Sequence, residues 1–310
     1  MKIFVTGATG FIGSAVVPEL IHAGHQVLGL TRSDAGAKVL TAAGAEVHRG
    51  ALGDLESLRS GAAKSDGVIH TAFNHDWSKF AENCEMDRRA IEALGSVLEG
   101  SDRPLLVTGG LAALTQGRPA TEDDQPIPVS ASYPRASEAA AAALGARGVN
   151  TSVVRLPQVH NTVKQGLITY LVALAREKGV SAYAGEGLNR WAAVHVLDAA
   201  RLYRLALEKR EAGVRYHAVA EEGVPLRDIA EIIGRGLKVP VVAMSPEEAA
   251  AHFGFLALFA SMDLQGSSEK TQKRLGWRPT GPGLIADLEQ MRYLETPTDR
   301  ASAAPMKASR

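Results

Sequence analysis

The sequence predicts an α/β fold built on a doubly wound parallel sheet, with a smaller mixed lobe toward the C-terminus. Short apolar runs rich in β-branched residues alternate with segments of helical periodicity through the first half of the chain. A glycine-rich turn follows the first of these runs. Strands that alternate with helices pair in parallel through right-handed crossovers, so the pattern favours an open sheet covered on both faces.

The predicted elements follow one another from the N-terminus with short connections. The segment "KIFVTG" is predicted to be a strand, the glycines after it a turn, and "AVVPELIHAG" a helix. Further strands are expected at "HQVLGL", "AEVHRG", "DGVIHTA", "PLLVTG" and "NTSVVRL", with helices between them. This succession is typical of a Rossmann-like sheet, in which ligands bind beyond the carboxyl ends of the strands.

The alternation loosens after Pro157, which indicates a change of architecture. A helix at "GLITYLVALAREKG", a strand at "VSAYAG" and two later helices predict a mixed substrate lobe. We predict a dinucleotide-binding domain over residues 1–161, with 189–212 returning to it, and a lobe over 162–188 and 213–295. Residues 296–310 have little to bury and are expected to form a flexible tail.

Composition excludes several classes of partner. Lysine and arginine together number 34, as do aspartate and glutamate, so no basic surplus favours a nucleic acid or an anionic membrane. No apolar run has the length of a membrane span, and the first glycine comes too early for a signal peptide. The single cysteine, Cys84, cannot form an internal disulfide. We expect a cytoplasmic protein with a small-molecule partner and, for want of metal-ligand spacing, no metal.

The turn "TGATGFIG" carries the first functional signal. Gly7, Gly10 and Gly13 are spaced so that a tight turn, a close backbone approach and a helix N-terminus come together. Free N–H groups and the positive end of the helix dipole at such a terminus favour phosphate. The turn therefore predicts a dinucleotide site.

The end of the second strand selects between the two nicotinamide cofactors, because an acidic residue there binds the ribose of NAD. The sequence reads "LGLTRSD", which places Arg32 and Ser33 where a 2′-phosphate needs a cation and a hydroxyl donor. NADP(H) is therefore preferred over NAD(H). Asp34 is the counter-argument, since a small shift of the turn brings it to the ribose.

Several ordered segments extend these observations into a family resemblance. "MKIFVTGATGFIG", "GALGDLESL", "VIHTAF", "RLPQVHN", "AAVHVLDAA" and "SSEKTQKRLGWRPT" are similar to motifs of the extended short-chain dehydrogenase/reductases, also called the NAD-dependent epimerase/dehydratase family. The resemblance implies an enzyme that binds a nicotinamide dinucleotide, and Asn83 matches the family's helix asparagine. Besides the three glycines, it implies cofactor contacts from Thr9, Phe11, Ile12, Asp54, Leu55, Thr71, Ala72, Phe73, Pro157 and Val159.

The same resemblance frames the catalytic residues. In such enzymes a tyrosine exchanges a proton with the substrate oxygen, a serine or threonine hydrogen-bonds that oxygen, and a lysine one helical turn after the tyrosine lowers its pKa. Tyr133 matches the tyrosine, and Thr108 is the hydroxyl that remains at the end of "LLVTGG". Ser137 stands in place of the lysine and is expected to bind the nicotinamide ribose.

Loss of the lysine predicts the direction of the reaction. An ammonium about 4 Å from the phenol is worth roughly 4 kcal/mol at an effective dielectric of about 20, or on the order of three pKa units. Without it a phenol titrates near about 10 and donates a proton better than it accepts one. Reduction of a carbonyl is the predicted direction. Pro134 suits a helix start, which leaves the alternative that Tyr133 only packs at a helix entry.

The leading hypothesis is an NADP(H)-dependent oxidoreductase that reduces a ketone, aldehyde or enone of a small hydrophobic substrate. His75, His160 and Asn161 follow strands and are candidate substrate ligands, with loop hydrogen bonding as the alternative. Two other functions remain open: a sugar-nucleotide epimerase or dehydratase, which needs an effective base, and a non-catalytic NADP(H)-binding redox sensor. A homodimer is the expected assembly.

Overall fold

The main sheet accounts for the apolar runs of the first half of the chain. The computed structural model describes residues 1–111, 114–115 and 117–293. Within these residues, parallel strands pair in the order β10-β6-β5-β4-β1-β2-β3. The strands are β1 (Lys2–Thr6), β2 (Gln26–Thr31), β3 (Glu46–Arg49), β4 (Gly67–His70), β5 (Leu105–Gly110), β6 (Thr151–Leu156) and β10 (Arg215–His217). The strand order reverses between β1 and β4, as in a doubly wound sheet.

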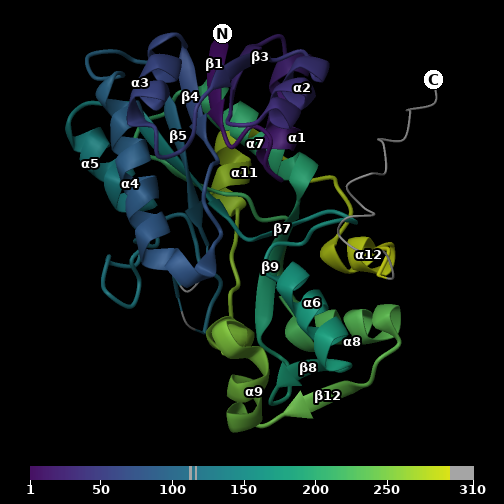
Figure 1. Cartoon of the computed structure of the whole chain (residues 1–310). Helices are drawn as coiled ribbons and strands as arrows, with labels where there is room; N and C mark the ends of the chain where they lie inside the picture. The colour runs from purple at the N-terminus through teal and green to yellow at the C-terminus, as the bar shows by residue number, and fades with distance from the viewer. Residues whose placement is uncertain (112–113, 116, 294–310) are drawn as a thin grey trace.

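Helices cover both faces of this sheet (Figure 1). One face packs against α1 (Gly13–His22), α2 (Asp34–Ala42) and α7 (Val196–Lys209), and the other against α3 (Leu55–Ala63), α4 (Phe80–Ser96) and α5 (Ser137–Ala146). Successive strand residues point to opposite faces, so Ile3 and Val5 join the first core while Phe4 joins the second. Both faces are buried, which leaves the strand ends to carry a site.

The lobe lies beyond the carboxyl ends of the large sheet, at the bottom of Figure 1. It contains a three-stranded sheet, β11-β9-β7, and a parallel pair, β12-β8. Its strands are β7 (Gln158–His160), β8 (Ser181–Ala184), β9 (Arg190–His195), β11 (Glu221–Pro225) and β12 (Val241–Met244). Its helical segments are α6 (Ile168–Lys178), α8 (Leu226–Leu237), α9 (Pro246–Phe253), η2 (Gly254–Leu256), α10 (Ala257–Ser261) and α12 (Leu284–Glu289).

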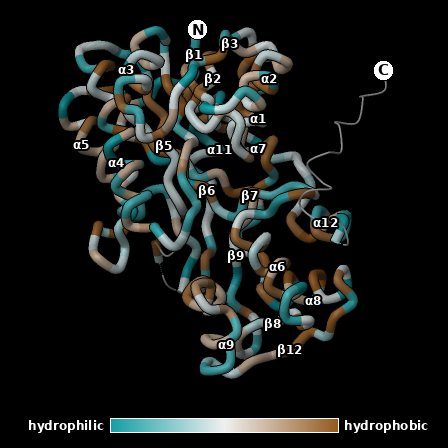
Figure 2. The backbone as a smooth tube through the Cα atoms, in the orientation of Figure 1, coloured by the Kyte–Doolittle hydropathy of each residue, from teal (hydrophilic) through white to brown (hydrophobic). Residues whose placement is uncertain are grey.

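The lobe has an apolar core of its own, separate from the two cores of the large sheet. Figure 2 shows hydrophobic and hydrophilic stretches along α8, and Leu226, Ile229 and Ile233 of this helix form its buried side. The predicted fold class, a Rossmann-like doubly wound sheet with a smaller mixed lobe, is confirmed.

The predicted division of the chain differs from the structure at more than one boundary. The strands β7 and β9 fall in ranges expected in the dinucleotide-binding domain, 1–161 and 189–212, but they form the three-stranded sheet of the lobe together with β11. We expected residues 213–295 to belong to the lobe, but β10 pairs with β6 and adds an outer strand to the large sheet. The helix α11 (Glu269–Leu275) packs against α7 and β10 and returns to the same unit. A three-residue strand has too little periodicity to be recognised in a sequence. The predicted tail, 296–310, lies outside the described residues.

Candidate active site

The glycine turn between β1 and α1 is shaped by close backbone contacts. Gly7 has a φ of +67°, and a Cβ added there lies 2.7 Å from the backbone nitrogen of Ala72. A Cβ added at Gly13 lies 2.1 Å from the carbonyl oxygen of Gly7. The Gly10 N–H donates to the same oxygen at 2.8 Å. Glycine is required at positions 7 and 13, because a side chain there collides with the backbone atoms that shape the turn. The resulting turn, at the N-terminus of α1, is a cradle of the kind that holds a pyrophosphate.

The other residues of the turn surround this cradle. Ile12 precedes α1 and offers no side-chain cap, so the helix N-terminus stays available to an anion. Thr9 is exposed and Phe11 is half-buried. The Lys164 ammonium lies 5.6 Å from the centre of the Phe11 ring. The turn therefore fits the phosphates of a dinucleotide.

The end of β2 leaves one cation free. Asp34 forms an ion pair with Arg49 at 2.5 Å, whereas Arg32 is exposed and has neither a hydrogen bond nor an ion pair within the described ranges. The Ser33 hydroxyl accepts from the Gly36 N–H at 3.0 Å and keeps its own proton to donate. Arg32 and Ser33 are thus free to meet an anion, and Asp34 is occupied.

The residues implied on the adenine side and after β4 are positioned by the backbone. Asp54 caps α3 by accepting from the Ser57 N–H at 3.1 Å, and Leu55 is the first, half-buried residue of that helix. The Thr71 hydroxyl donates to the Thr6 carbonyl at 2.8 Å. These bonds hold the two loops at the strand ends, next to the glycine turn.

Two further implied contacts lie between β6 and β7. Pro157 connects these strands and is half-buried, so part of its surface is accessible from the strand ends. The Val159 side chain is 4% exposed and packs in the core beneath α1 and α7. Only the backbone of Val159 is therefore available to a ligand.

Tyr133 lies in a turn ahead of a helix, as expected, but the helix does not start at Pro134. The Tyr133 N–H donates to the Ser130 carbonyl at 3.1 Å and its carbonyl accepts from the Ser130 N–H at 3.0 Å. The helix α5 begins only at Ser137. Pro134 restricts the residue before it to extended conformations, which opposes a helix at Tyr133.

A small cavity brings the Tyr133 side chain close to the end of β5. The lining residues come from the strand end, the loop before the tyrosine and the start of α5, and include Gly109, Gly110, Leu114, Pro126, Ile127, Pro128, Val129, Tyr133, Arg135, Ser137, Glu138 and Ala139. Burial raises the pKa of the Tyr133 phenol above its ordinary value, and the positive charge of Arg135 opposes part of that rise. The phenol is therefore protonated at neutral pH.

Ser137 heads a chain of buried hydrogen bonds. Its hydroxyl donates to Asp87 at 2.6 Å, the second Asp87 oxygen lies 3.0 Å from His70 Nε2, and His70 Nδ1 lies 2.8 Å from the Thr6 hydroxyl. All four residues are at most 2% exposed. Because the Ser137 proton is committed to Asp87, this hydroxyl can offer a ribose only its acceptor lone pairs.

The sequence did not identify Asp87, which lies one helical turn after the expected Asn83. The Asn83 amide donates to the Asp76 carbonyl at 2.8 Å and so secures the loop after β4. Both residues are on α4 and buried. The acidic residue at this position carries no signal of its own in the sequence, because its partners His70 and Ser137 are distant along the chain.

Thr108 has no proton left for a substrate. Its hydroxyl donates to the His70 carbonyl at 2.7 Å and lies 2.6 Å from the hydroxyl of the buried Tyr203, which must then be the donor. The neighbouring Gly109 leaves room for Glu138, whose carboxylate lies 3.0 Å from a Cβ added there. We therefore no longer expect Thr108 to donate to a substrate oxygen.

The Glu138 carboxylate is held by a buried arginine. Arg155 on β6 is fully buried and binds both oxygens of Glu138, at 2.9 and 2.8 Å. Its third contact is the Asp124 carbonyl, at 2.9 Å. The start of α5, β6 and the loop before Tyr133 are thus joined around one charge pair.

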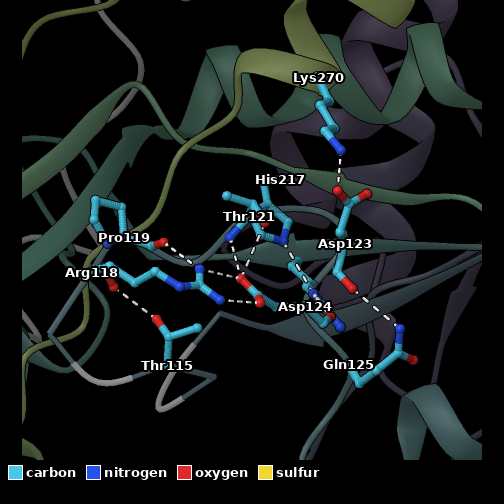
Figure 3. Close-up of polar contacts among 10 residues, drawn as sticks. Thr115, Arg118, Pro119, Thr121, Asp123, Asp124, Gln125, His217 and Lys270 are labelled. Atoms are coloured by element: carbon cyan, nitrogen blue, oxygen red, sulfur yellow. Dashed lines mark hydrogen bonds and ion pairs between the residues drawn. The ribbon is translucent and has the colours of Figure 1, made fainter.

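The same loop is pinned by surface charges (Figure 3). Arg118 binds both oxygens of Asp124, at 2.5 and 2.9 Å, and Lys270 of α11 pairs with Asp123. The Glu122 carboxylate accepts from the Thr271 hydroxyl at 2.6 Å. These contacts fix the described part of the segment that lines the Tyr133 cavity.

The three candidate substrate ligands have different surroundings. His75 is exposed after β4, with its ring 5.2 Å from that of Phe73. His160 is fully buried, and its Nδ1 lies 2.6 Å from the Asp287 carboxylate of α12. It therefore contributes to the packing of the lobe and is not open to a substrate. Asn161 accepts from two backbone N–H groups and shapes the turn that presents Lys164.

Two kinds of feature are absent from the described ranges. No cluster of three His, Cys, Asp or Glu side chains there is arranged to hold a metal ion. No helix among the same residues is both long and apolar enough to cross a bilayer.

Comparisons with known proteins agree with this geometry. A protein from Schizosaccharomyces pombe that is described as uncharacterized is 48% identical over 94% of this chain and 100% of its own length. A 4-hydroxy-2-methyl-3-oxo-4-farnesyl-3,4-dihydroquinoline-1-oxide ketoreductase from Stigmatella aurantiaca is 27% identical over 82% of this chain and 80% of its own. The structure of Thermus thermophilus UDP-glucose 4-epimerase with NAD shares the fold, with a TM-score of 0.73 at 19% identity, over 94% of this chain and 99% of that one.

The family comparison gives the most specific match. The model of the NAD dependent epimerase/dehydratase family matches residues 3–220, which include the glycine turn, Tyr133 and Ser137. The resemblance inferred from the sequence motifs is confirmed, and the chain is an enzyme of oxidoreductase type that belongs to the NAD dependent epimerase/dehydratase family.

Proposed function

We propose that this enzyme reduces the carbonyl of a ketone, aldehyde or enone on a small hydrophobic substrate, with NADP(H) as the cofactor and Tyr133 as the proton donor. The observation that carries the proposal is the state of Tyr133. Burial raises the pKa of its phenol, and Ser137, where the family has a lysine, is uncharged and bonded to Asp87. A phenol without a neighbouring ammonium favours donation of a proton over its removal.

Residues at the strand ends would hold the cofactor, which supplies a hydride when bound. The cradle formed by Gly7, Gly10 and Gly13 accommodates a pyrophosphate. Arg32, which has no partner in the described chain, supports a 2′-phosphate and hence NADP(H). The Ser137 oxygen can accept a hydrogen bond from a ribose hydroxyl, and Asp87 fixes its orientation.

The phenol of Tyr133 would then protonate the oxygen that gains negative charge during reduction. Gly110 leaves space for a substrate at the end of β5, because a Cβ added there meets no atom within 4 Å, and the loop from Pro126 to Val129 lines the same cavity. Arg155 is neutralised by Glu138, so it adds rigidity to the site and no free charge. The similarity to a ketoreductase supports a ketone as the reacting group.

Two alternatives make different demands on the site. Epimerisation or dehydration of a sugar nucleotide begins with an oxidation, for which Tyr133 must act as a base, and its raised pKa opposes that role. A non-catalytic redox sensor needs no proton donor at all, but the chain belongs to a family of enzymes. Cofactor consumption distinguishes this alternative from the reductase.

The test is oxidation of NADPH, followed by its absorbance, with purified protein and a panel of ketones, aldehydes, quinones and enones. NADH is run in parallel, and both dissociation constants are measured by calorimetry. We expect turnover with at least one class of carbonyl and a preference for NADPH. Tight NADPH binding without turnover across the panel would contradict the reductase and favour the sensor.

Two secondary proposals concern location and assembly. A cytoplasmic location rests on the single cysteine, which is buried and free. A homodimer is our proposal for the assembly, and analytical ultracentrifugation of the purified chain tests it.

A further inference from the structure

An aromatic cluster joins the loop after β4 to the lobe. It consists of Phe73, His75, Trp77, Phe80, Tyr170 of α6 and Phe255 of η2. Trp77 stacks on both Phe80 and Phe255. Its ring centre lies 5.2 Å from that of Phe80 and 5.9 Å from that of Phe255. The Phe255 side chain is nevertheless 55% exposed. The aromatic cluster therefore has an open apolar edge, where a ring of a ligand can continue the stack.

Two hydrogen-bond donors of this region are buried without an acceptor. Trp77 Nε1 and Arg135 Nε both lack a partner, although neither atom reaches solvent. A buried donor left unpaired costs about 1–3 kcal/mol, so native structures rarely leave one without a reason. The chain's own groups thus leave the hydrogen bonding of this region incomplete.

Arg135 differs from the buried Arg155 in that, within the described part of the protein, no carboxylate neutralises its charge. Arg155 is paired with Glu138 at 2.8 Å, whereas the Arg135 guanidinium has no ion pair in the described chain and lies 4.5 Å from the centre of the Phe73 ring. The same side chain lines the Tyr133 cavity. An unpaired cation thus connects the aromatic cluster to the proton donor.

Lys164 adds a second positive charge on the other side of the site. Its ammonium lies over the Phe11 ring, in the glycine turn, and has no carboxylate partner among the described residues. Both cations act on His75. Desolvation is the largest cause that lowers the pKa of its imidazole, and the positive charges of Arg135 and then Lys164 lower it further. The region around His75 is therefore positive while His75 itself tends to be neutral.

We propose that Arg135 and the open edge of the aromatic cluster form a subsite for an aromatic or conjugated ring that carries a carboxylate. The carboxylate pairs with Arg135, whose guanidinium lies over Phe73 of the aromatic cluster, and the ring packs against the exposed part of that cluster. A planar guanidinium suits two carboxylate oxygens at once. This inference rests on the proposed reductase, whose substrate class it narrows to a carbonyl compound with a ring and a carboxylate.

The test measures binding of probes that the enzyme cannot reduce. The dissociation constants of 2-naphthoate and 2-naphthamide are determined by calorimetry with the full-length protein, with and without NADPH. The two probes share a ring and differ in charge, so the ratio of their constants isolates the carboxylate. We expect 2-naphthoate to bind at least about 10-fold more tightly than 2-naphthamide, because only the carboxylate can form a charge-assisted hydrogen bond with Arg135.

Substitutions assign the effect to the proposed residues. Arg135→Gln should reduce the preference for the carboxylate to less than about 2-fold, and Arg135→Lys should restore part of it. Trp77→Phe keeps an aromatic ring in the cluster and removes only a buried N–H, so it should leave the preference for the carboxylate unchanged. The matched control is Arg147→Gln at the end of α5, whose ion pair with Glu99 is on the surface, and it should leave the preference unchanged.

Equal binding of the two probes, no measurable binding of 2-naphthoate, or a preference that survives Arg135→Gln would each overturn the subsite. Because neither probe is turned over, this result is independent of the reductase test. A protein that binds 2-naphthoate through Arg135 but oxidises no NADPH keeps the subsite and loses the proposed reaction. A reductase that shows no preference for the carboxylate keeps the reaction and loses the subsite.

Discussion

The carboxyl edge of the large sheet has a cofactor half, after β1 and β2, and a catalytic half, after β5 and β6. In the cofactor half, Gly7 and Gly13 occupy positions where an added Cβ meets backbone atoms at 2.7 and 2.1 Å. In the catalytic half, Ser137 stands where the resemblance implies a lysine, and it is bonded to Asp87. Close backbone contacts in the cofactor half admit only glycine. In the catalytic half a different side chain can occupy the lysine position, because a neighbouring polar group, Asp87, bonds the serine found there.

The largest expected effect concerns the catalytic half. Tyr133→Phe keeps the ring in its cavity and removes the proton, so kcat for NADPH-dependent reduction should fall by about 10²–10⁴-fold. The NADPH dissociation constant, measured by calorimetry, should change by less than about 3-fold. A variant with unchanged turnover would remove Tyr133 from the mechanism and leave it as a packing residue.

The next effect tests the cofactor half. Gly13→Ala places a methyl group 2.1 Å from the Gly7 carbonyl, and the turn must shift to admit it. Overpacking of this kind costs on the order of 1–3 kcal/mol, so NADPH should bind about 10–100-fold more weakly. Gly145→Ala on α5 is the control, since its added methyl meets only the Thr151 hydroxyl at 3.2 Å. Equal NADPH affinity in the two variants would mean that the turn does not hold the phosphates.

A substitution of Arg32 tests the preference of the cofactor half for NADPH over NADH. Arg32→Ala removes the free cation at the end of β2, and the ratio of the NADH and NADPH dissociation constants should fall by about 10-fold, through weaker NADPH binding. The control is Arg59→Ala on α3, whose ion pair with Glu56 is exposed and local. If Arg32→Ala leaves the ratio intact, the cofactor preference has another origin.

The smallest effect is on stability and concerns His217, near the loop that lines the Tyr133 cavity. Burial lowers its pKa to about 4, with Glu122 opposing the shift and Arg155 adding to it. The folded state keeps a neutral imidazole that the unfolded chain protonates below its ordinary pKa of about 6.5. Stability is therefore full above about pH 6.5 and is lost as the pH falls toward 4.

In the variant His217→Gln, the free energy of unfolding should fall by on the order of 2 kcal/mol less between pH 7 and pH 4 than in the wild-type protein. Urea unfolding at each pH measures it. His252→Gln serves as the control, because His252 is half-buried on α9 of the lobe, where burial and then Lys178 lower its pKa. A pH dependence that is the same in both variants would exclude His217 as its source.

The sequence motifs predicted the cofactor half more completely than the catalytic half. The glycines of the turn lie within seven residues, and two local features require them: the positive φ of Gly7 and the Gly7 carbonyl beside Gly13. Their spacing therefore carries the prediction. Asp87 joins the candidate site only because folding brings it to His70 and to Ser137, which lies 50 residues later in the chain. Nothing local distinguishes it from a solvated acidic residue on a helix.

Two other differences have similar causes. Thr108 was expected to serve the substrate, but Tyr203, 95 residues later in the chain, donates to its hydroxyl and commits it to the interior. The short strand β10 was missed because its pairing with β6, and not its own periodicity, makes it a strand. Long-range partners decide both cases, and a single sequence does not specify them.

The most direct test of the account is the pH dependence of kcat for NADPH-dependent reduction, measured from pH 6 to 10.5 with the best substrate of the panel. Tyr133 donates a proton and its pKa is raised by burial, so the rate should stay level through about pH 9 and fall only above the ordinary phenol value of about 10. A fall centred near pH 7 or 8 would show a phenol with a lowered pKa. That result would contradict the claim that loss of the lysine leaves Tyr133 as an acid.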